Sequence, residues 1–512
     1  MNVRTAREGE KFMQLIESIN GLINGWVWGP PMLILMGVVG VLMTLLTGVF
    51  QLRHMGHWMK KTIGGIVGNR DVTAHTKDKS ISQFQSLCTA LAATVGTGNI
   101  VGVAGAIASG GPGAVFWMWV IAFFGMMTNY SENVLGIYYR RKNAAGEWSG
   151  GAMYYLRDGL GSKPGCKAIG AVLAALFSVF CFLASFGIGN MTQVNSIASN
   201  MRSAFGVPTW ITGIGVLIAV GAVVLGGLKR IAAVTEKIVP FMVILYIAGS
   251  VVILATHFTM LPAIFASIFK GAFGMQAVGG GIVGFGLKQA VVMGMKRGVF
   301  SNEAGLGSSV MVHSNSNVEE PVQQGMWGIF EVFADTIIVC TLTAVSILAS
   351  GDIDLATGQL AAGVESSGLA SAAFGAMFGR PGEMFIAVAI LLFAFSTVLG
   401  WSHYGSKACE YLLGLKATWI YKVVFTAATF GGAVMGQNLA WDIADTLNGL
   451  MAIPNLIGVL ALSGTVAAIT KNYLERNLQG KQVKPMLSAF DDVQAEQEQS
   501  LAAHSGRETA AA

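Results

Sequence analysis

The chain has 512 residues, 53% of them hydrophobic and only 12% charged, and its formal net charge at pH 7 is +5. Ordinary soluble domains carry about 25% charged residues, so this composition excludes a soluble protein of the usual kind. The apolar residues gather in runs of about 20, the length that a helix needs to cross roughly 30 Å of hydrocarbon. The sequence therefore predicts an all-α integral membrane protein.

The chain begins with a segment, residues 1–29, that lacks the continuous apolar core of a signal peptide. Its apolar residues recur at helical spacing, which predicts an amphipathic helix in the membrane interface: Phe12, Leu15, Ile16, Ile19, Ile23 and Trp26. The apolar runs that follow predict about eleven transmembrane helices, at residues 31–50, 84–108, 114–138, 169–190, 210–228, 238–257, 276–295, 322–350, 383–402, 419–437 and 443–469. Residues 474–512 show no periodicity and predict a disordered tail.

The Lys and Arg residues are divided unevenly between the two sides of these runs. Positively charged loops stay in the cytoplasm, and the larger share lies there if the N-terminus is outside and the tail inside. We therefore predict a multi-pass protein of the plasma membrane, the bacterial inner membrane, in that orientation. The basic net charge then reflects topology and does not indicate nucleic-acid binding.

The second run, 84–108, is interrupted in a way that a plain transmembrane helix is not. Its middle reads Gly96-Thr97-Gly98-Asn99. A broken helix frees peptide amides and carbonyls, which are costly to leave in lipid and therefore face protein or a wet cavity. Freed amides can hold a carboxylate and freed carbonyls a cation, so the pattern predicts a substrate and ion site.

The seventh run, 276–295, is also rich in glycine and opens with Gly279, Gly280 and Gly281. Helices two to six and seven to eleven then form two sets of five, each beginning with an interrupted helix, as in an inverted repeat with a site at its axis. The alternative is that these glycines serve only close helix packing. The predicted segments are the interfacial segment 1–29, an extra helix with a basic loop 30–83, the first repeat 84–257, a connection with the second broken helix 258–321, the rest of the second repeat 322–473 and the tail 474–512.

Six motifs stand in or beside these runs: TALAATVGTGNIVGVA (89–104), GPGAVFWMW (111–119), SGGAMYYL (149–156), FGIGNMTQVNSIA (186–198), KRGVFSNEAGLGSS (296–309) and FSTVLGWSHYG (395–405). Together they resemble the alanine or glycine:cation symporter family over residues 26–473. The resemblance implies the leucine-transporter fold of five plus five inverted helices, preceded by one extra helix. It also implies a secondary transporter, functional as a monomer, that carries alanine or glycine with sodium. Proton coupling, or a preference for glutamine or serine, is the alternative.

By that resemblance, the substrate binds between the two broken helices. The residues assigned to it are Thr97, Gly98, Asn99, Gln193, Gly280, Gly281 and Trp401. The first three would present amides and polar groups to the carboxylate, and Gln193 would reach either end of the zwitterion. The glycine pair would offer backbone groups from the other side, and Trp401 would close the pocket against large side chains. The alternative for Trp401 is an interfacial aromatic belt, since Ser402 and His403 follow it at the cytoplasmic end.

The same resemblance implies a sodium site made of neutral oxygen atoms. Its ligands would be the carbonyls of Ala92, Val95 and Phe393 and the hydroxyls of Ser396 and Thr397. Hard oxygen ligands suit an alkali cation, and carbonyls and hydroxyls bind it without a buried carboxylate. The alternative for both hydroxyls is a bond back to their own helix.

Two acidic residues remain to be placed. Asp335 lies in the eighth run, where a charge costs about 2.5 to 3.5 kcal/mol on insertion scales, and we expect a structural ion pair with Lys288 rather than an ion-coupling role. The motif SNEAGLGS (301–308) is expected just after the seventh helix on the cytoplasmic side. There Asn302 and Glu303 would begin a short helix, and Glu303 would pair with Arg or Lys in a gate.

Other classes of function are disfavoured by what the sequence lacks. An enzyme would need convergent His, Asp, Ser or Cys groups within the membrane, and a primary pump would need a Walker-type phosphate-binding motif. A channel would need an oligomeric filter motif. The five cysteines form no Cys-x-x-Cys pair, so no metal cluster is expected, and the co-transported sodium ion is the only cofactor predicted.

Overall fold

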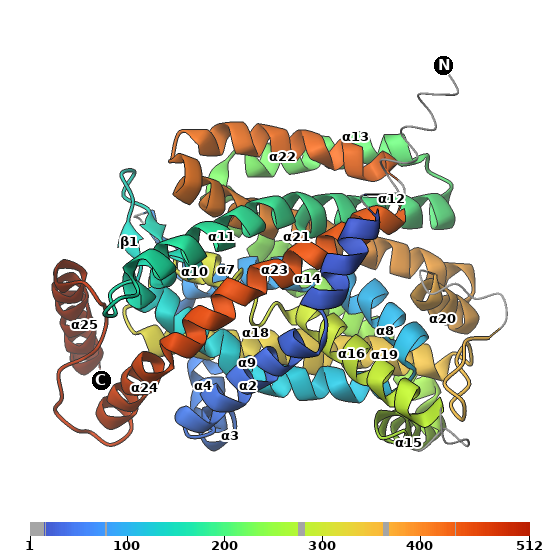
Figure 1. The fold of residues 1–512 in the computed structure, drawn as a ribbon, viewed down its shortest axis with the longest axis horizontal. Helices are drawn as coiled ribbons and strands as arrows, with labels where there is room; N and C mark the ends of the chain where they lie inside the picture. Colours follow the sequence, from blue (N-terminus) through green and yellow to red (C-terminus); the bar gives the residue numbers. More distant parts are fainter. Residues whose placement is uncertain are drawn as a thin grey trace.

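The computed structural model describes residues 15, 17–76, 79–274, 282–361, 368–435 and 437–511, and this part of the chain is almost entirely helical (Figure 1). Its named strands are β1 (Arg141–Lys142) and β2 (Trp148–Ser149), which form one antiparallel hairpin. Long apolar helices pack around a buried centre. The predicted all-α integral membrane protein is confirmed.

The first half of the chain supplies the helices up to α14; π-helical and 3-10 segments carry the letter η. The N-terminal helices are α2 (Pro30–Leu46), α3 (Phe50–Arg53), α4 (Met55–Lys61), α5 (Ile63–Gly68) and α6 (Arg70–Thr73). They are followed by α7 (Gln83–Thr94), η1 (Gly98–Gly102), α8 (Val103–Gly110), α9 (Gly113–Tyr138), α10 (Ala152–Tyr154), η2 (Tyr155–Leu160), α11 (Lys167–Phe186), η3 (Gly187–Met191), α12 (Thr192–Phe205), α13 (Thr209–Val224) and α14 (Gly227–Thr256).

The second half continues the bundle and ends in the tail. Its first elements are η4 (Phe258–Met260), α15 (Leu261–Ala272), α16 (Ile282–Asn302), α17 (Val310–His313), α18 (Pro321–Val332), η5 (Phe333–Cys340), α19 (Thr341–Ala349) and α20 (Leu369–Phe378). The last are α21 (Arg380–Leu413), α22 (Ala417–Val434), α23 (Gln437–Ala461), α24 (Ser463–Asn477) and α25 (Asp491–Ala511).

Seven helices of the described residues are long and apolar enough to cross a membrane, and the bent pair Gln83–Thr94 and Gly98–Gly110 makes eight. The other predicted spans, 210–228, 276–295 and 419–437, coincide at least in part with α13, α16 and α22. α13 has only 16 residues and α16 carries Lys and Arg side chains, so length and composition alone do not mark them as spans. The count of eleven stays a prediction, although each predicted run contains a helix.

Three of the long helices are interrupted by π-helical stretches. These are η1 between α7 and α8, η3 between α11 and α12, and η5 between α18 and α19. Stretches of this kind frequently mark functional sites, because the wider turn leaves backbone groups without their usual partners. η1 packs on η5, while η3 packs on α21, which also contacts α7. The three interruptions are therefore connected to one another through η1, α7 and α21.

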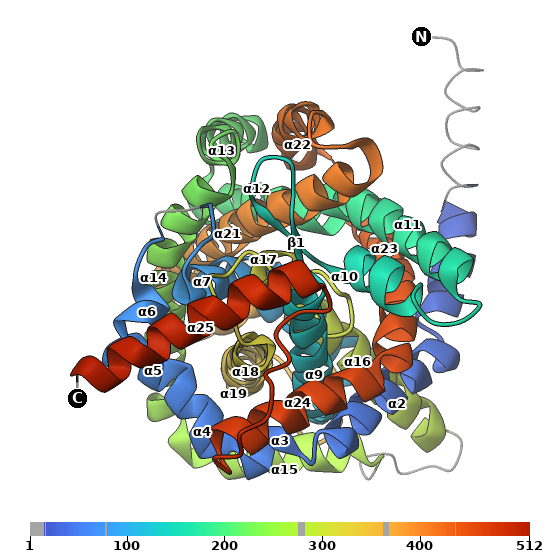
Figure 2. The same ribbon diagram turned by 90° about the vertical axis from the view of Figure 1, so that its left-hand side faces the viewer.

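The C-terminal tail differs from the expected disorder. The α25 helix crosses one end of the bundle, in front of α17 and α18 in Figure 2. Phe490 lies under the Arg141 guanidinium, 3.4 Å from the ring centroid, and Glu496 pairs with Lys142 at 2.6 Å. Val493 is buried. A few apolar and acidic side chains are thus enough to dock a tail whose average composition is that of a disordered chain.

The described part of the predicted interfacial segment is helical and continues into the first span, so that Glu17–Leu46 counts as one apolar helix of 30 residues. Trp28 donates from its indole nitrogen to the carbonyl of Asp445 at 2.9 Å, and Val27 is buried against Gly449 of α23. Helical structure there agrees with the sequence. Its placement in the membrane interface stays a prediction.

Candidate functional site

The first predicted interruption is present between α7 and η1, where the span bends by 49°. The amide of Gly96 donates to Asn99 Oδ1 at 2.8 Å, and the amide of Thr97 donates to Gln193 Oε1 at 3.3 Å. In a continuous helix these two amides would bond to carbonyls four residues earlier. Side chains have replaced those carbonyls as acceptors, so two carbonyls at the end of α7 are released from the helix ladder.

Thr97 carries the clearest sign of a polar ligand. Its side chain is completely buried, and its hydroxyl has no hydrogen-bond partner within the described structure. Leaving such a group unpaired costs about 1–3 kcal/mol, which a bound polar molecule would offset. Gln193, which follows η3, donates from Nε2 to the carbonyl of Ile188 at 2.9 Å, and this bond fixes Oε1 toward the interruption.

The predicted sodium residues lie where α7 meets α21. A Cβ built on Gly96 would meet the hydroxyl of Thr397, and one built on Gly400 would lie 2.7 Å from the Cβ of Ala93. The two backbones can approach this closely because glycine stands at both positions. The structure therefore brings Thr397 of α21 to the end of α7 from which carbonyls are released.

The individual sodium candidates are placed unequally. All five are buried: Ala92, Val95, Phe393, Ser396 and Thr397. The hydroxyls of Ser396 and Thr397 both donate to the carbonyl of Phe393, at 2.8 and 3.0 Å, which is the back-bonded alternative. Ser396 also lies 3.4 Å from the sulfur of Met242 on α14. Thr397 is thus next to the interruption, while Ser396 contacts a different neighbour.

The second interruption that the sequence predicts, at the glycine-rich start of the seventh run, stays a prediction. Gly280 and Gly281 lie outside the described residues. α16 runs through Asn302, and the chain then leaves the helix over residues 303–309, all of which are buried. Three residues there have left-handed backbone angles that end a helix: Glu303 (φ 56°), Gly305 (φ 96°) and Gly307 (φ 71°).

The expected cytoplasmic start of a short helix at SNEAGLGS is therefore wrong, because Asn302 ends α16 and the motif is buried in the bundle. The end of α16 also touches the first interruption. A Cβ on Gly98 would lie 3.2 Å from Phe300 Cδ1 and 3.3 Å from Ser301 Cα. A side chain at position 98 would therefore require Phe300 and Ser301 to shift by a few tenths of an ångström. The break at the end of α16, called the second interruption from here on, thus meets the first one.

Trp401 is fully buried, so the interfacial-belt alternative is wrong. Its indole nitrogen donates to Glu303 Oε1 at 2.7 Å, and Ser308 donates to Oε2 at 2.5 Å. A Cβ on Gly189, in η3, would lie 2.8 Å from Trp401 Cδ2. The indole is thus clamped between η3 and the second interruption. Glu303 holds an indole rather than an Arg or Lys, and the ion pairs of the described chain do not include it.

The expected ion pair between Asp335 and Lys288 is wrong as well. Asp335 accepts hydrogen bonds from Asn99 and Ser301, at 2.6 and 2.8 Å, in the centre of the bundle. Lys288 lies elsewhere, in a largely apolar groove between α16 and α2 that is also lined by Pro30, Leu33, Ile34, Val291, Val292 and Met295. Asp335 and Lys288 therefore contact different neighbours.

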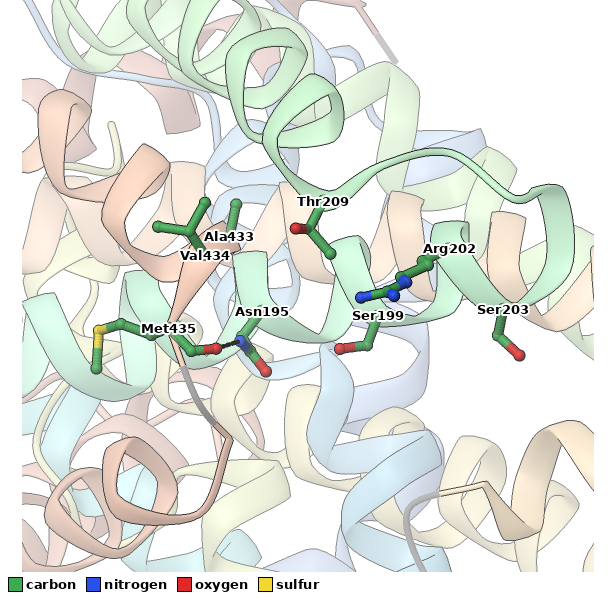
Figure 3. A pocket seen from close by; sticks show the side chains of 8 residues that line it. All are labelled: Asn195, Ser199, Arg202, Ser203, Thr209, Ala433, Val434 and Met435. Atoms are coloured by element: carbon green, nitrogen blue, oxygen red, sulfur yellow. Dashed lines mark hydrogen bonds between the residues drawn. The ribbon is translucent and has the colours of Figure 1, made fainter.

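A separate cavity of about 520 Å³ lies farther along α12 (Figure 3). It is lined by Asn195, Ser199, Arg202, Ser203, Thr209, Ala433, Val434 and Met435. Asn195 Nδ2 donates to the carbonyl of Met435 at 2.8 Å, as drawn in Figure 3. None of the predicted substrate or sodium residues lines this cavity, so it is distinct from the predicted site.

Sequence reasoning missed Phe300 and Ser301 as neighbours of the first interruption, and Glu303 as the partner of Trp401. The available signal was the motif SNEAGLGS, in which two glycines stand among polar residues. Such a composition is typical of an unwound segment, but the length of the seventh apolar run placed the motif outside the membrane.

The chain is similar in sequence to known transporters along nearly its whole length. Residues 13–487 match the model of the sodium:alanine symporter family. The chain is 43% identical over 463 residues to the sodium/alanine symporter AgcS of Methanococcus maripaludis, which covers 90% of this chain and 98% of AgcS. It is 35% identical over 470 residues to the probable sodium/glutamine symporter GlnT of Bacillus subtilis, covering 91% and 93%. Among solved structures it resembles MhsT in complex with L-phenylalanine, with a TM-score of 0.48 and 15% identity over 77% of this chain and 99% of MhsT.

Proposed function

The chain belongs to the sodium:alanine symporter family, and from this premise we propose that it carries alanine or glycine across the plasma membrane together with sodium ions. It is a multi-pass membrane transporter and not an enzyme. The observation that carries the proposal is the interruption of α7, where a buried hydroxyl without a partner stands beside two released carbonyls.

The substrate in this proposal is held at the first interruption. The Thr97 hydroxyl and the backbone of Gly98 and Asn99 bind the carboxylate, and Gln193 orients the Thr97 amide beside it. What supports this is the burial of all four residues together with the unpaired hydroxyl. The contribution expected of the glycine pair at 280 and 281 stays a prediction.

Trp401 is proposed to set the size of the accepted side chain. The indole is held at its nitrogen by Glu303, and its Cβ, Cγ and Cδ2 atoms lie close to Gly189 of η3. A ring fixed on two sides cannot turn away to admit a larger molecule. A methyl group or a hydrogen atom, as in alanine and glycine, then fits better than a long apolar chain.

Sodium is a co-transported substrate in this account and is bound by the released carbonyl of Ala92 and by Thr397, with Val95, Phe393 and Ser396 as further candidates. Neutral oxygen atoms suit this ion. An ion bound there would join α7 to α21, so it would favour the conformation in which the interruption is correctly shaped for substrate. Coupling then follows from the difference in sodium affinity between the two conformations.

The remaining assignments belong to the same proposal. The N-terminus lies outside and the tail in the cytoplasm, which agrees with the uneven distribution of Lys and Arg. The tail helix α25 and the β1–β2 hairpin would then lie on the cytoplasmic face. The proposal keeps the monomer that the family resemblance implies.

Uptake of labelled alanine into proteoliposomes tests the proposal. We expect accumulation when sodium is higher outside and little uptake under a proton gradient of equal size. Uptake that ignores sodium would refute the coupling, and uptake driven equally by protons would favour proton coupling.

Competition by unlabelled glycine, serine and glutamine tests the substrate in the same vesicles. The similarity to a probable sodium/glutamine symporter makes glutamine the second candidate. We expect glycine to compete strongly and glutamine weakly. Stronger competition by glutamine than by glycine would replace the substrate in this proposal while leaving sodium coupling intact.

A further inference from the structure

Asp335 occupies a position that the proposed substrate and sodium sites do not use. It lies in η5, its side chain is completely buried, and both of its oxygen atoms accept hydrogen bonds. Asn99 Nδ2 donates to Oδ1 at 2.6 Å, and Ser301 Oγ and Thr336 Oγ1 each donate to Oδ2 at 2.8 Å. Three donors thus converge on one carboxyl group in the middle of the membrane domain.

These donors come from three separate elements. Asn99 belongs to the first interruption, Ser301 to the last turn of α16 beside the second interruption, and Thr336 to η5 itself. Asn99 uses its other amide atom, Oδ1, to accept the amide of Gly96 at 2.8 Å. A continuous line of hydrogen bonds therefore runs from the unwound peptide group of Gly96 through Asn99 and Asp335 to Ser301.

The direction of the hydrogen bonds in this line requires an acceptor at position 335. Asn99 must present its oxygen to Gly96, because the peptide group there is a donor, and it must therefore present its NH2 group to position 335. The ion pairs of the described chain include no partner for Asp335, so hydrogen bonds are its observed stabilisation. A carboxyl group is costly to bury in a membrane domain, and one that serves only helix packing gains nothing over an apolar side chain.

We propose that Asp335 is a positioning residue that holds the two helix interruptions in register, by fixing Asn99 on one side and Ser301 on the other. This inference rests on the proposed function, since it concerns the geometry of the same substrate site. Asp335 does not touch the substrate in this account. It sets the orientation of Asn99, and hence the shape of the Gly96–Asn99 segment that binds it.

An exchange of the two side chains tests this proposal. In Asp335→Asn alone, one oxygen of the carboxyl group becomes an NH2 group. Turned toward Asn99, this group opposes another donor. Turned away, it removes the acceptor to which the Ser301 and Thr336 hydroxyls now donate, so both hydroxyls must rotate to accept instead. In Asn99→Asp alone, two carboxyl groups face one another. In the double variant the amide at 335 donates to the carboxylate at 99, whose other oxygen still accepts from Gly96. Every hydrogen bond of the line is then restored with the donor direction reversed at one step.

The readout is the alanine concentration that gives half-maximal sodium-driven uptake, separated from the maximal rate, with the amount of folded protein per vesicle measured by size-exclusion chromatography before reconstitution. We expect each single variant to raise that concentration by about tenfold or more, the factor that corresponds to about 1.4 kcal/mol. We expect the exchange to bring it back to within about threefold of the wild type. Asp354→Asn, in an exposed turn, is the matched control and leaves it unchanged.

An unchanged half-maximal alanine concentration in Asp335→Asn overturns the inference. So does an exchange variant whose half-maximal alanine concentration is as high as that of the more impaired single variant. If the single variants do not fold, the exchange decides alone: a folded, transporting exchange supports the positioning role, and an unfolded one overturns it. Wild-type protein that takes up no alanine with sodium would refute the proposed function instead, so the two failures are distinguishable.

Discussion

Gly96→Ala is the substitution whose consequence can be worked out most fully. Gly96 stands in the first interruption, and a Cβ there would press on the Thr397 hydroxyl while lying 3.3 Å from the Thr397 Cβ and 3.5 Å from Gln193 Oε1. Its backbone has no left-handed angle, so alanine meets no conformational obstacle of its own. The new methyl group must therefore displace Thr397, and with it the proposed sodium ligand.

Overpacking a tight site costs about 1–3 kcal/mol. If that cost falls on the sodium-bound conformation, the sodium concentration for half-maximal alanine uptake rises by a factor of about 5 to 150. The assay is the initial rate of labelled alanine uptake into proteoliposomes at a series of sodium concentrations. The expected change is in sodium affinity first, because the methyl group points at Thr397.

Gly105→Ala is the matched control, because Gly105 lies in α8 of the same broken span and a Cβ there would meet nothing within 4 Å. Alanine is favoured over glycine in a helix by about 0.5–1 kcal/mol, so this variant should be as stable as the wild type or more so. Sodium dependence in Gly96→Ala that is the same as in Gly105→Ala would refute the placement of the ion between α7 and α21.

Three further predictions follow from the site and the tail. Thr97→Val keeps the shape of the side chain but removes the hydroxyl, and we expect alanine affinity, measured by half-maximal uptake, to fall about 5- to 10-fold. Thr97→Ser keeps the hydroxyl and should stay close to the wild type. Equal alanine affinity in the two variants would contradict the role of the hydroxyl. Trp401→Ala should let larger amino acids compete for labelled alanine uptake, and unchanged selectivity would show that the indole does not set the pocket size. The double variant Lys142→Glu with Glu496→Lys exchanges the two charges and should keep α25 protected from limited proteolysis. Either change alone should speed cleavage only slightly, because exposed ion pairs contribute about 0–1 kcal/mol to stability. Rapid cleavage of α25 in the single variants would contradict that estimate.

The bundle and the first interruption were predictable because both are written in local sequence. A run of about 20 apolar residues has one stable state in lipid, and Gly-Thr-Gly-Asn inside such a run has few explanations other than a break. The association of Gln193 and Trp401 with that break came from the family resemblance. The structure places Gln193 on Thr97 and Trp401 against the second interruption.

The break at the end of α16 was not predicted by the same reasoning, because the length of an apolar run sets where its helix is predicted to end. The helix α16 continues past Lys296 and Arg297 to Asn302. In a sequence, two adjacent positive charges at the end of an apolar run indicate a membrane boundary. In the structure both side chains pair with Asp445 of α23, and the chain continues into the bundle. Asp445, which is more than a hundred residues away in the sequence, thus pairs with the two charges that locally indicate a membrane boundary.

The partners of Asp335 were unpredictable for a related reason. Lys288 lies within a predicted transmembrane run, whereas the actual partners are the amide of Asn99 and the hydroxyl of Ser301. Burial of a carboxyl group by neutral donors depends on three elements meeting, and no local pattern records it. The tail shows the converse case, because composition indicated disorder where a few side chains dock a helix.

The most direct test of the account is an experimental structure of the protein with sodium and alanine bound. We predict density for alanine within hydrogen-bonding distance of the Thr97 hydroxyl, between the interruption at Gly96–Asn99 and Trp401, and density for the ion between the end of α7 and Thr397. Alanine bound in the cavity beside Asn195 and Arg202 instead, with an unoccupied and unchanged interruption of α7, would contradict it.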